Sequence, residues 1–166
     1  MFEHSIGPFF DEKSNILILG SFPSVKSREE NFYYANKQNR FWKVLAQVFK
    51  DQVPESESEK KNFLTAHGIA LWDVIASCEI LGSSDASIKN VTPSDISLIL
   101  ENAPIEKLVL NGKKAAQLFY RNQGSALPLR NCKAQVIEVY ELPSTSPANA
   151  AFSIDKLIAH WSIISK

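Results

Sequence analysis

The hydrophobic positions of this chain fall into short apolar runs separated by segments with helical spacing. Residues 15–20 (NILILG) form a continuous Ile/Leu run that ends in glycine, which is typical of a strand buried on both faces of a parallel sheet. Residues 69–75 (IALWDVI) follow the same pattern and carry one acid, Asp73. Two further strands are predicted at residues 107–110 and 135–140.

Helices are predicted between and after these strands. In residues 38–50, apolar side chains recur at helical spacing with charged residues between them. Residues 92–102 open with a Thr-Pro-Ser-Asp sequence, which is a helix-start signal. The remaining predicted helices are residues 54–66, 113–120 and 153–164.

This alternation predicts an α/β fold: a three-layer α/β/α arrangement around a central, four-stranded, mainly parallel sheet. No internal repeat or linker interrupts the pattern, so residues 1–166 are predicted to form a single domain. Ligands of such sheets bind beyond the carboxyl ends of the strands. We therefore expect one cleft, formed by residues 21–39, Asp73 and the residues after it, residues 111–114 and residues 142–149.

The composition is that of a globular protein without an overall charge. Of the 166 residues, 45% are hydrophobic, and 18 Lys and Arg balance 18 Asp and Glu, which argues against indiscriminate coating of nucleic acid or membranes. The charges are unevenly distributed, because residues 107–133 hold six basic residues and no acid, whereas residues 51–106 hold ten acids and three lysines. Two explanations remain open: solvated helix faces, or a basic rim of the cleft that contacts phosphates.

The cysteine and histidine pattern excludes several kinds of site. Cys78 and Cys132 are the only cysteines and form no CxxC motif, which excludes a four-cysteine zinc site and an iron–sulfur cluster. His4, His67 and His160 are scattered along the chain, so we expect neither a metal nor a cofactor.

No apolar run approaches the roughly 20 residues that a membrane span needs. The first ten residues (MFEHSIGPFF) also lack the basic-then-apolar pattern of a secretion signal. We therefore expect a soluble, cytoplasmic protein that makes no membrane contact and acts as a monomer.

Five segments together carry a family resemblance. They are GSFPS at residues 20–24, YYANKQNRFWKVL at 33–45, ALWDVI at 70–75, LNGKKA at 110–115 and LPSTSPAN at 142–149. In this order they resemble the uracil-DNA glycosylase superfamily over essentially the whole chain. The most similar branch is that of the hypoxanthine (deoxyinosine) DNA glycosylases, and the NRFW run also resembles the mismatch-specific uracil-DNA glycosylases.

Two positions depart from the classical members of this superfamily. Phe22 stands where those enzymes have an Asp or Asn that positions the attacking water, and Leu142 stands where they have a catalytic His. The hypoxanthine branch resembles this chain in both losses. The resemblance implies that its catalytic group, the Asn of NRFW, is Asn39 in this chain.

Cleavage of an N-glycosidic bond builds positive charge on the sugar and negative charge on the departing base. Asn39 could orient water or support the cationic sugar through its amide oxygen, so catalysis would depend on positioning and electrostatics. An Asn at the start of a helix is also a favoured cap, and the two roles are geometrically compatible.

The resemblance also implies a set of base-binding residues. Tyr34 corresponds to the aromatic residue that stacks on the extruded base, and Phe22 could stack from the opposite side or close the pocket. Asp73 lies where the superfamily reads the base edge, and its carboxylate can accept the N1–H of hypoxanthine, which adenine lacks. Asn111 could contact the base. Turn-capping roles for Asp73 and Asn111 remain open as alternatives.

Further residues are expected to contact the DNA backbone or the minor groove. LPSTSPAN stands where the family has its Pro-Ser minor-groove loop, and a helix start with basic residues favours a phosphate. These residues are Ser21, Ser24, Lys113, Pro143, Ser144, Thr145, Ser146 and Asn149.

Together these features predict a monofunctional DNA glycosylase of base-excision repair, an N-glycosyl hydrolase. It would flip a deaminated nucleotide, deoxyinosine first, out of DNA containing deaminated bases and activate water against it. Two alternatives remain: a glycosylase specific for uracil or thymine mismatches, and a catalytically inactive DNA-binding member of the superfamily.

Overall fold

The computed structural model describes residues 2–3, 6–79 and 88–166. Its central sheet has four parallel strands in the order β3-β2-β6-β7. These strands are β2 (Ile16–Gly20), β3 (Ile69–Asp73), β6 (Lys107–Asn111) and β7 (Glu138–Leu142). Because Ile16 pairs with both Ile69 and Lys107, the carboxyl ends of the strands lie at one edge of the sheet.

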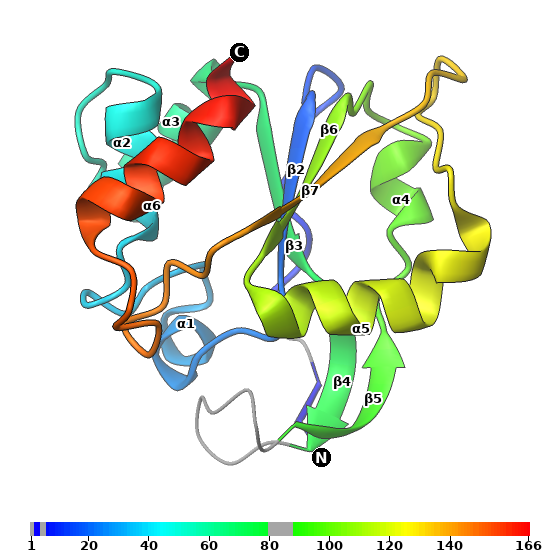
Figure 1. Cartoon of the computed structure of the whole chain (residues 1–166), viewed down its shortest axis with the longest axis horizontal. Helices are drawn as coiled ribbons and strands as arrows, with labels where there is room; N and C mark the ends of the chain where they lie inside the picture. The colour runs from blue at the N-terminus through cyan, green and yellow to red at the C-terminus, as the bar shows by residue number, and fades with distance from the viewer. Residues whose placement is uncertain (1, 4–5, 80–87) are drawn as a thin grey trace.

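Helices cover both faces of this sheet, as the sequence predicted. They are α1 (Val25–Glu30), α2 (Phe41–Val48), α3 (Glu57–Ala66), α4 (Ser97–Leu100), α5 (Lys113–Gln123) and α6 (Ile154–Trp161), with 3₁₀ turns at Gly124–Ala126 and Ser162–Ser165. Figure 1 shows α2, α3 and α6 on one side of the sheet and α4 and α5 on the other. The three-layer α/β/α prediction is confirmed.

The side chains of β2 alternate between two hydrophobic cores, one on each face of the sheet. Leu17 and Leu19 pack into the core that holds the buried residues of α4 and α5. Ile16 and Ile18 pack into the core of α2, α3 and α6. Successive side chains of a strand point to opposite faces, so a strand covered on both sides must be apolar throughout. This explains the unbroken run that predicted β2.

The segment after β3 does not continue the strand to residue 75 as predicted. It crosses into a smaller antiparallel sheet with the order β1-β4-β5, formed by β1 (Phe2–Glu3), β4 (Ile75–Glu79) and β5 (Lys89–Pro93). Val74 lies at the crossing: its N–H donates to Gly20 O at 2.8 Å, and its carbonyl accepts the N–H of Ser94 at 2.7 Å. The crossing leaves Asp73 at the carboxyl edge of the central sheet.

The prediction of a helix at residues 92–102 is wrong for the first half of this range. Thr92 and Pro93 end β5, and α4 begins only at Ser97. Asp95 supplies the start signal instead, because its carboxylate accepts the N–H of Ser97 at 3.1 Å and the hydroxyl of the same residue at 2.6 Å.

Two other boundaries differ from the predictions near the site. The last strand, predicted at residues 135–140, is β7 and ends at Leu142, while Val136 makes only an isolated bridge to Arg130. The helix predicted at residues 38–50 is shorter at both ends, so Asn39 lies just before α2. Both differences bring candidate residues to the carboxyl edge of the sheet.

Candidate functional site

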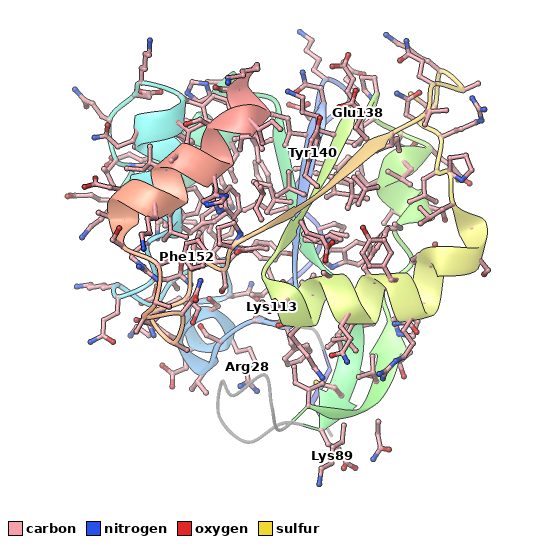
Figure 2. The ribbon with its side chains drawn as sticks, in the orientation of Figure 1. Arg28, Lys89, Lys113, Glu138, Tyr140 and Phe152 are labelled. Carbon is pink, nitrogen blue, oxygen red and sulfur yellow. The ribbon has the colours of Figure 1, made fainter. Side chains whose placement is uncertain are left out.

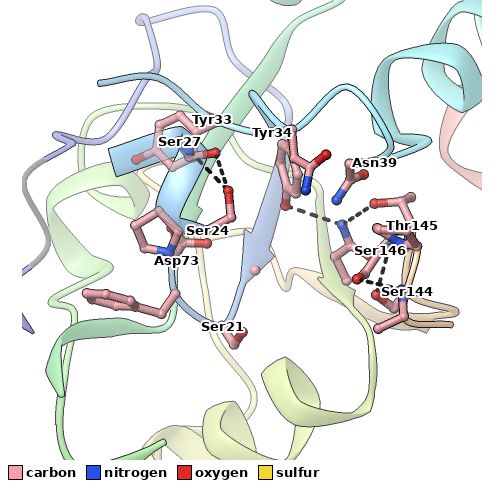
Figure 3. Close-up of a pocket in the computed structure, with 17 residues that line it drawn as sticks. Ser21, Ser24, Ser27, Tyr33, Tyr34, Asn39, Asp73, Ser144, Thr145 and Ser146 are labelled. Atoms are coloured by element: carbon pink, nitrogen blue, oxygen red, sulfur yellow. Dashed lines mark hydrogen bonds between the residues drawn. The ribbon is translucent and has the colours of Figure 1, made fainter. Parts of the chain in front are cut away.

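A cavity of about 660 Å³ lies at the carboxyl edge of the central sheet. The ends of β2, β3 and β6 contribute to it, together with the segment before α2 and the loop after β7 (Figure 3). The residues that line it are Gly20, Ser21, Phe22, Pro23, Ser24, Ser27, Tyr33, Tyr34, Asn36, Asn39, Asp73, Asn111, Ser144, Thr145, Ser146, Pro147 and Ala148. Most of the predicted site residues therefore meet in one cavity, which we call the main pocket.

Asn39 directly precedes Arg40, the N-cap residue of α2, and lines the main pocket. Its Oδ1 accepts the N–H of Phe41, the first residue of α2, at 2.9 Å. An N–H must face an oxygen, so this bond fixes which end of the amide is oxygen. The nitrogen end is turned toward the pocket (Figure 3) and donates to no described residue. One lone pair of the amide oxygen is therefore occupied by the N–H of Phe41, and the nitrogen offers a donor to a ligand. A role of the oxygen in orienting water stays a prediction.

Tyr34 is held in an unusual backbone conformation at the pocket wall. Its φ is +51°, in the left-handed region that costs a non-glycine residue free energy. The Trp42 Nε1–H donates to its carbonyl at 3.1 Å, and its ring stacks on Phe41 with centroids 3.8 Å apart. Phe41 covers one face of the ring, so a base could stack only on the opposite face.

Asp73 lies on the floor of the main pocket, across from Asn39 (Figure 3). Its side chain is only 3% exposed. A Cβ atom built on Gly20 would lie 2.5 Å from Asp73 Oδ1 and 3.2 Å from the Tyr34 hydroxyl. The carboxylate thus packs directly against the backbone at the end of β2, and this approach requires glycine at position 20.

Tyr33 lies beside this carboxylate and was not among the predicted site residues. Its hydroxyl donates to Gly7 O at 2.8 Å. Burial first, and then the nearby Asp73 carboxylate and Tyr34, raise its pKa far above the ordinary value for tyrosine. Tyr33 is therefore a neutral hydrogen-bond donor near neutral pH.

Phe22 and the serines after it form another wall. Phe22 is 9% exposed, and the Arg28 guanidinium lies 5.5 Å from its ring centroid. Ser24 caps α1 by accepting the N–H of Ser27 at 3.1 Å, and Ser27 Oγ accepts the N–H of Ala35 at 3.0 Å. Ser27 thus ties the first loop to the segment that carries Tyr34, a role for which the sequence held no signal.

Asn111 connects three parts of the site. Its Nδ2 donates to Thr145 Oγ1 at 3.1 Å and to the Tyr34 hydroxyl at 3.3 Å, and its Oδ1 accepts the N–H of Thr145 at 3.1 Å. Both amide hydrogens are thus used within the protein, so the side chain joins the end of β6 to the loop after β7. A direct contact between Asn111 and a base stays a prediction.

Thr145 is fully buried, with 0% of its surface exposed. Besides its bonds to Asn111, its carbonyl accepts the N–H of Arg40 at 3.1 Å. In this structure the residue anchors the loop that carries Ser144 and Ser146. A contact of Thr145 with the DNA backbone stays a prediction.

Arg40 is the main brace of the same loop. Its guanidinium donates to three backbone carbonyls, those of Ser146 at 2.9 Å, Asn149 at 3.1 Å and Phe152. On the other side, the Trp161 Nε1–H donates to Pro143 O at 2.9 Å. The loop is therefore fixed from α2, from β6 and from α6, as well as by its own prolines.

Three predicted backbone-contact residues lie outside the main pocket. Lys113, Pro143 and Asn149 line a second cavity of about 730 Å³, on the other side of the loop after β7. Lys113 is exposed at the start of α5, and Asn149 Nδ2 donates to Ser144 O at 3.0 Å. Gly112 has a φ of +102°, and a Cβ there would lie 2.9 Å from Ser144 Cβ, so glycine allows the loop to approach α5.

The described residues contain no group of three or more His, Cys, Asp and Glu side chains that could hold a metal ion. Within the same residues, no helix is both long and apolar enough to cross a membrane.

The profile of the Uracil DNA glycosylase superfamily matches residues 8–162. The chain belongs to this superfamily. The match covers every segment that forms the main pocket, including the two positions, Phe22 and Leu142, at which the chain departs from the classical members. Leu142 is buried at the end of β7 and does not line the main pocket.

Named relatives and a solved structure agree with this assignment. The hypoxanthine DNA glycosylase of Methanosarcina acetivorans is 34% identical over 155 residues, which are 92% of each chain. That of Methanosarcina barkeri is 34% identical over 112 residues, 66% of this chain and 71% of the relative. A solution NMR structure of a candidate uracil DNA glycosylase from M. acetivorans superposes with a TM-score of 0.80 at 29% identity, covering 99% of this chain and 97% of that one.

Proposed function

We propose that this protein is a monofunctional DNA glycosylase that removes deaminated bases from DNA, hypoxanthine first. The observation that carries the proposal is that Asn39, Tyr34 and Asp73 all line one pocket of a size that suits a base. The names of the relatives from M. acetivorans and M. barkeri support hypoxanthine as the substrate base.

Hydrolysis breaks the bond between the sugar C1′ and the base nitrogen. The electron pair of this bond leaves with the base, and a water oxygen bonds to C1′. The proton that this water loses ends on the departing base, which is released as the neutral free base. Asn39 Nδ2 acts on this reaction as a hydrogen-bond donor to the departing base. Such a bond strengthens as negative charge develops, so it stabilises the transition state more than the bound substrate.

Asp73 selects the base. Its carboxylate is an acceptor, and hypoxanthine presents a donor at N1–H, where adenine presents an acceptor. One carboxylate oxygen lies close against the Gly20 backbone. Uracil and thymine also carry a ring N–H next to a carbonyl, so a comparison of the three bases belongs in the first experiment.

Tyr34 and Phe22 supply aromatic surface to the extruded base, worth about 1–3 kcal/mol for each base that stacks. Outside the pocket, the hydroxyls of Ser21, Ser24, Ser144 and Ser146 can donate to the phosphates that flank the flipped nucleotide. Lys113 and Asn149 continue this phosphate path past Pro143.

No lysine lines the main pocket in the described part of the chain. The reaction therefore proceeds by direct attack of water and stops at an abasic site, since the covalent route needs an amine nucleophile at C1′. We further propose that the enzyme acts as a monomer, on DNA in the cytoplasm.

The test is base release from oligonucleotides that contain one deoxyinosine, one uracil or one mismatched thymine, as single strands and as duplexes. We expect free hypoxanthine and an alkali-labile abasic site, with slower release of the two pyrimidines. Faster release of uracil or thymine would show that this base, and not hypoxanthine, is the preferred substrate. Binding of deoxyinosine DNA without release of any base would identify an inactive DNA-binding protein.

A further inference from the structure

The second cavity shares a wall with the main pocket. Ser144, Ser146 and Ala148 line both cavities, so the loop after β7 separates them by a single thickness of chain. The bonds from Arg40 and Asn111 hold this partition in place. Two adjoining cavities with a fixed partition suit two neighbouring units of one ligand.

The walls of the second cavity combine aromatic surface with positive charge. Phe152 and His160 form an edge-to-face pair with centroids 5.5 Å apart. Lys113 and Lys114, at the start of α5, lie on the opposite side of the segment after β7 from Phe152, as Figure 2 shows for Lys113. Glu141 is the one acid in the described lining, so the basic side chains outnumber it.

We propose that the second cavity binds the nucleotide next to the flipped one on the same DNA strand. Its base lies against Phe152 and His160, and its phosphate lies toward Lys113 and Lys114. This inference rests on the proposed glycosylase function. It goes beyond that function by assigning a second nucleotide site, in which Phe152, His160 and Lys114 contact the DNA.

Continuity and charge favour this occupant over a peptide or a free small molecule. A nucleotide extruded into the main pocket remains joined to its neighbours by phosphodiester links, so the strand must pass the rim of the partition. The Ser144 and Ser146 side chains lie on that partition and can donate to the link. A base beyond it has lost its stacking partner, and an aromatic pair can replace that partner.

The test combines protein variants with shortened substrates. His160→Ala removes an exposed ring from α6, and Phe152→Leu removes an aromatic face while keeping a large apolar side chain. Lys156→Ala, an exposed change on the same helix that lines neither cavity, is the matched control. Each protein is assayed on single strands with deoxyinosine in the interior, at the 5′ end or at the 3′ end, and on a duplex with deoxyinosine in the interior.

On the interior substrate, we expect each ring variant to raise KM about fivefold or more while kcat changes little, because one stacking contact is lost. On one of the two terminal substrates, the variant and the wild type should have equal KM, because the nucleotide that fills the cavity is missing. The ratio of the control's KM to the wild-type KM should be the same on all three single-stranded substrates.

Equal ratios on all three substrates for the ring variants would overturn the proposal, and so would a KM penalty that appears only with duplex DNA. The latter outcome would assign the cavity to the complementary strand. If the wild type releases no hypoxanthine from the interior substrate, the proposed function fails instead, so the two failures are distinguishable.

Discussion

Replacing Asn39 by aspartate separates two roles that replacement by alanine removes together. Oδ1 of Asn39 accepts the N–H of Phe41 at the start of α2. Aspartate keeps an acceptor in this place and is itself a good helix cap, but it has no N–H to donate into the pocket. Alanine removes both the acceptor and the donors.

The expected effects follow from these bonds. Loss of a donor to developing negative charge lowers kcat by about 10²–10³-fold. Asn39→Asp should lose at least this much, because its charge also repels an anionic base in a pocket that already contains Asp73. Asn39→Ala should lose a similar factor in kcat and, in addition, about 1 kcal/mol of stability from the start of α2. In a protein of this size that lowers the melting temperature by about 2–4 °C.

The assay is single-turnover release of hypoxanthine from a labelled deoxyinosine oligonucleotide, together with thermal unfolding of each variant. Asn36→Asp is a matched control, because Asn36 lines the same pocket and its Oδ1 accepts the N–H of Gln38 at 2.9 Å. The control should retain most of the activity. Retention of release within about threefold by Asn39→Asp would refute the donor role and favour an acceptor that orients water.

Four further predictions test the walls and the frame of the pocket. Asp73→Asn should lower kcat/KM for deoxyinosine about tenfold and reduce the preference for deoxyinosine over deoxyadenosine. The neutral amide accepts a weaker hydrogen bond than the carboxylate, and its N–H can donate to the adenine N1. An unchanged ratio of kcat/KM between the two substrates would contradict this. Gly20→Ala should cause the same loss in a folded protein, because its methyl group would lie 2.5 Å from Asp73 Oδ1; unchanged kinetics would show that the carboxylate is not used. Arg40→Lys should lower the melting temperature and raise KM several-fold, since an ammonium cannot span three carbonyls; normal KM in both single-stranded and duplex DNA would show that the loop needs no such brace. Iodoacetamide should modify the exposed Cys132 in the native protein but reach Cys78 only after unfolding, because burial shields this thiol and raises its pKa; equal labelling by mass spectrometry would contradict the burial.

The inner strands of the central sheet were predictable because they are covered on both faces. Residues 16–19 and 108–110 are apolar at successive positions, a signal that can be read without any knowledge of the fold. The strands at 75–79 and 89–93 carry no such signal, since most residues of the second are exposed. Their pairing depends on partners distant in the sequence, so local patterns could not reveal it.

The candidate site likewise contains residues that the sequence could predict and residues that it could not. Residues that resemble a family motif, such as Asn39 and Asp73, could be placed in one cleft from the sequence because the carboxyl ends of parallel strands meet. Ser27 could not, because its importance comes from one hydrogen bond to Ala35. Thr145 was assigned to DNA for its hydroxyl, and the sequence held no signal that this hydroxyl also accepts a bond from Asn111 inside the protein.

The loop after β7 is held by contacts that no local sequence pattern could reveal. Three of its hydrogen bonds come from the single guanidinium of Arg40, whose carbonyl partners lie more than 100 residues away in the sequence. Arg40 directly follows Asn39, so the residue that holds the partition is bonded to a residue that lines the main pocket. A shift of the partition would therefore also displace the start of α2, where the hydrogen bond from the Phe41 N–H orients the Asn39 amide. The binding of the DNA strand against the loop and the orientation of the Asn39 donor therefore depend on the same segment. Variants of Arg40 should impair kcat whenever they impair KM.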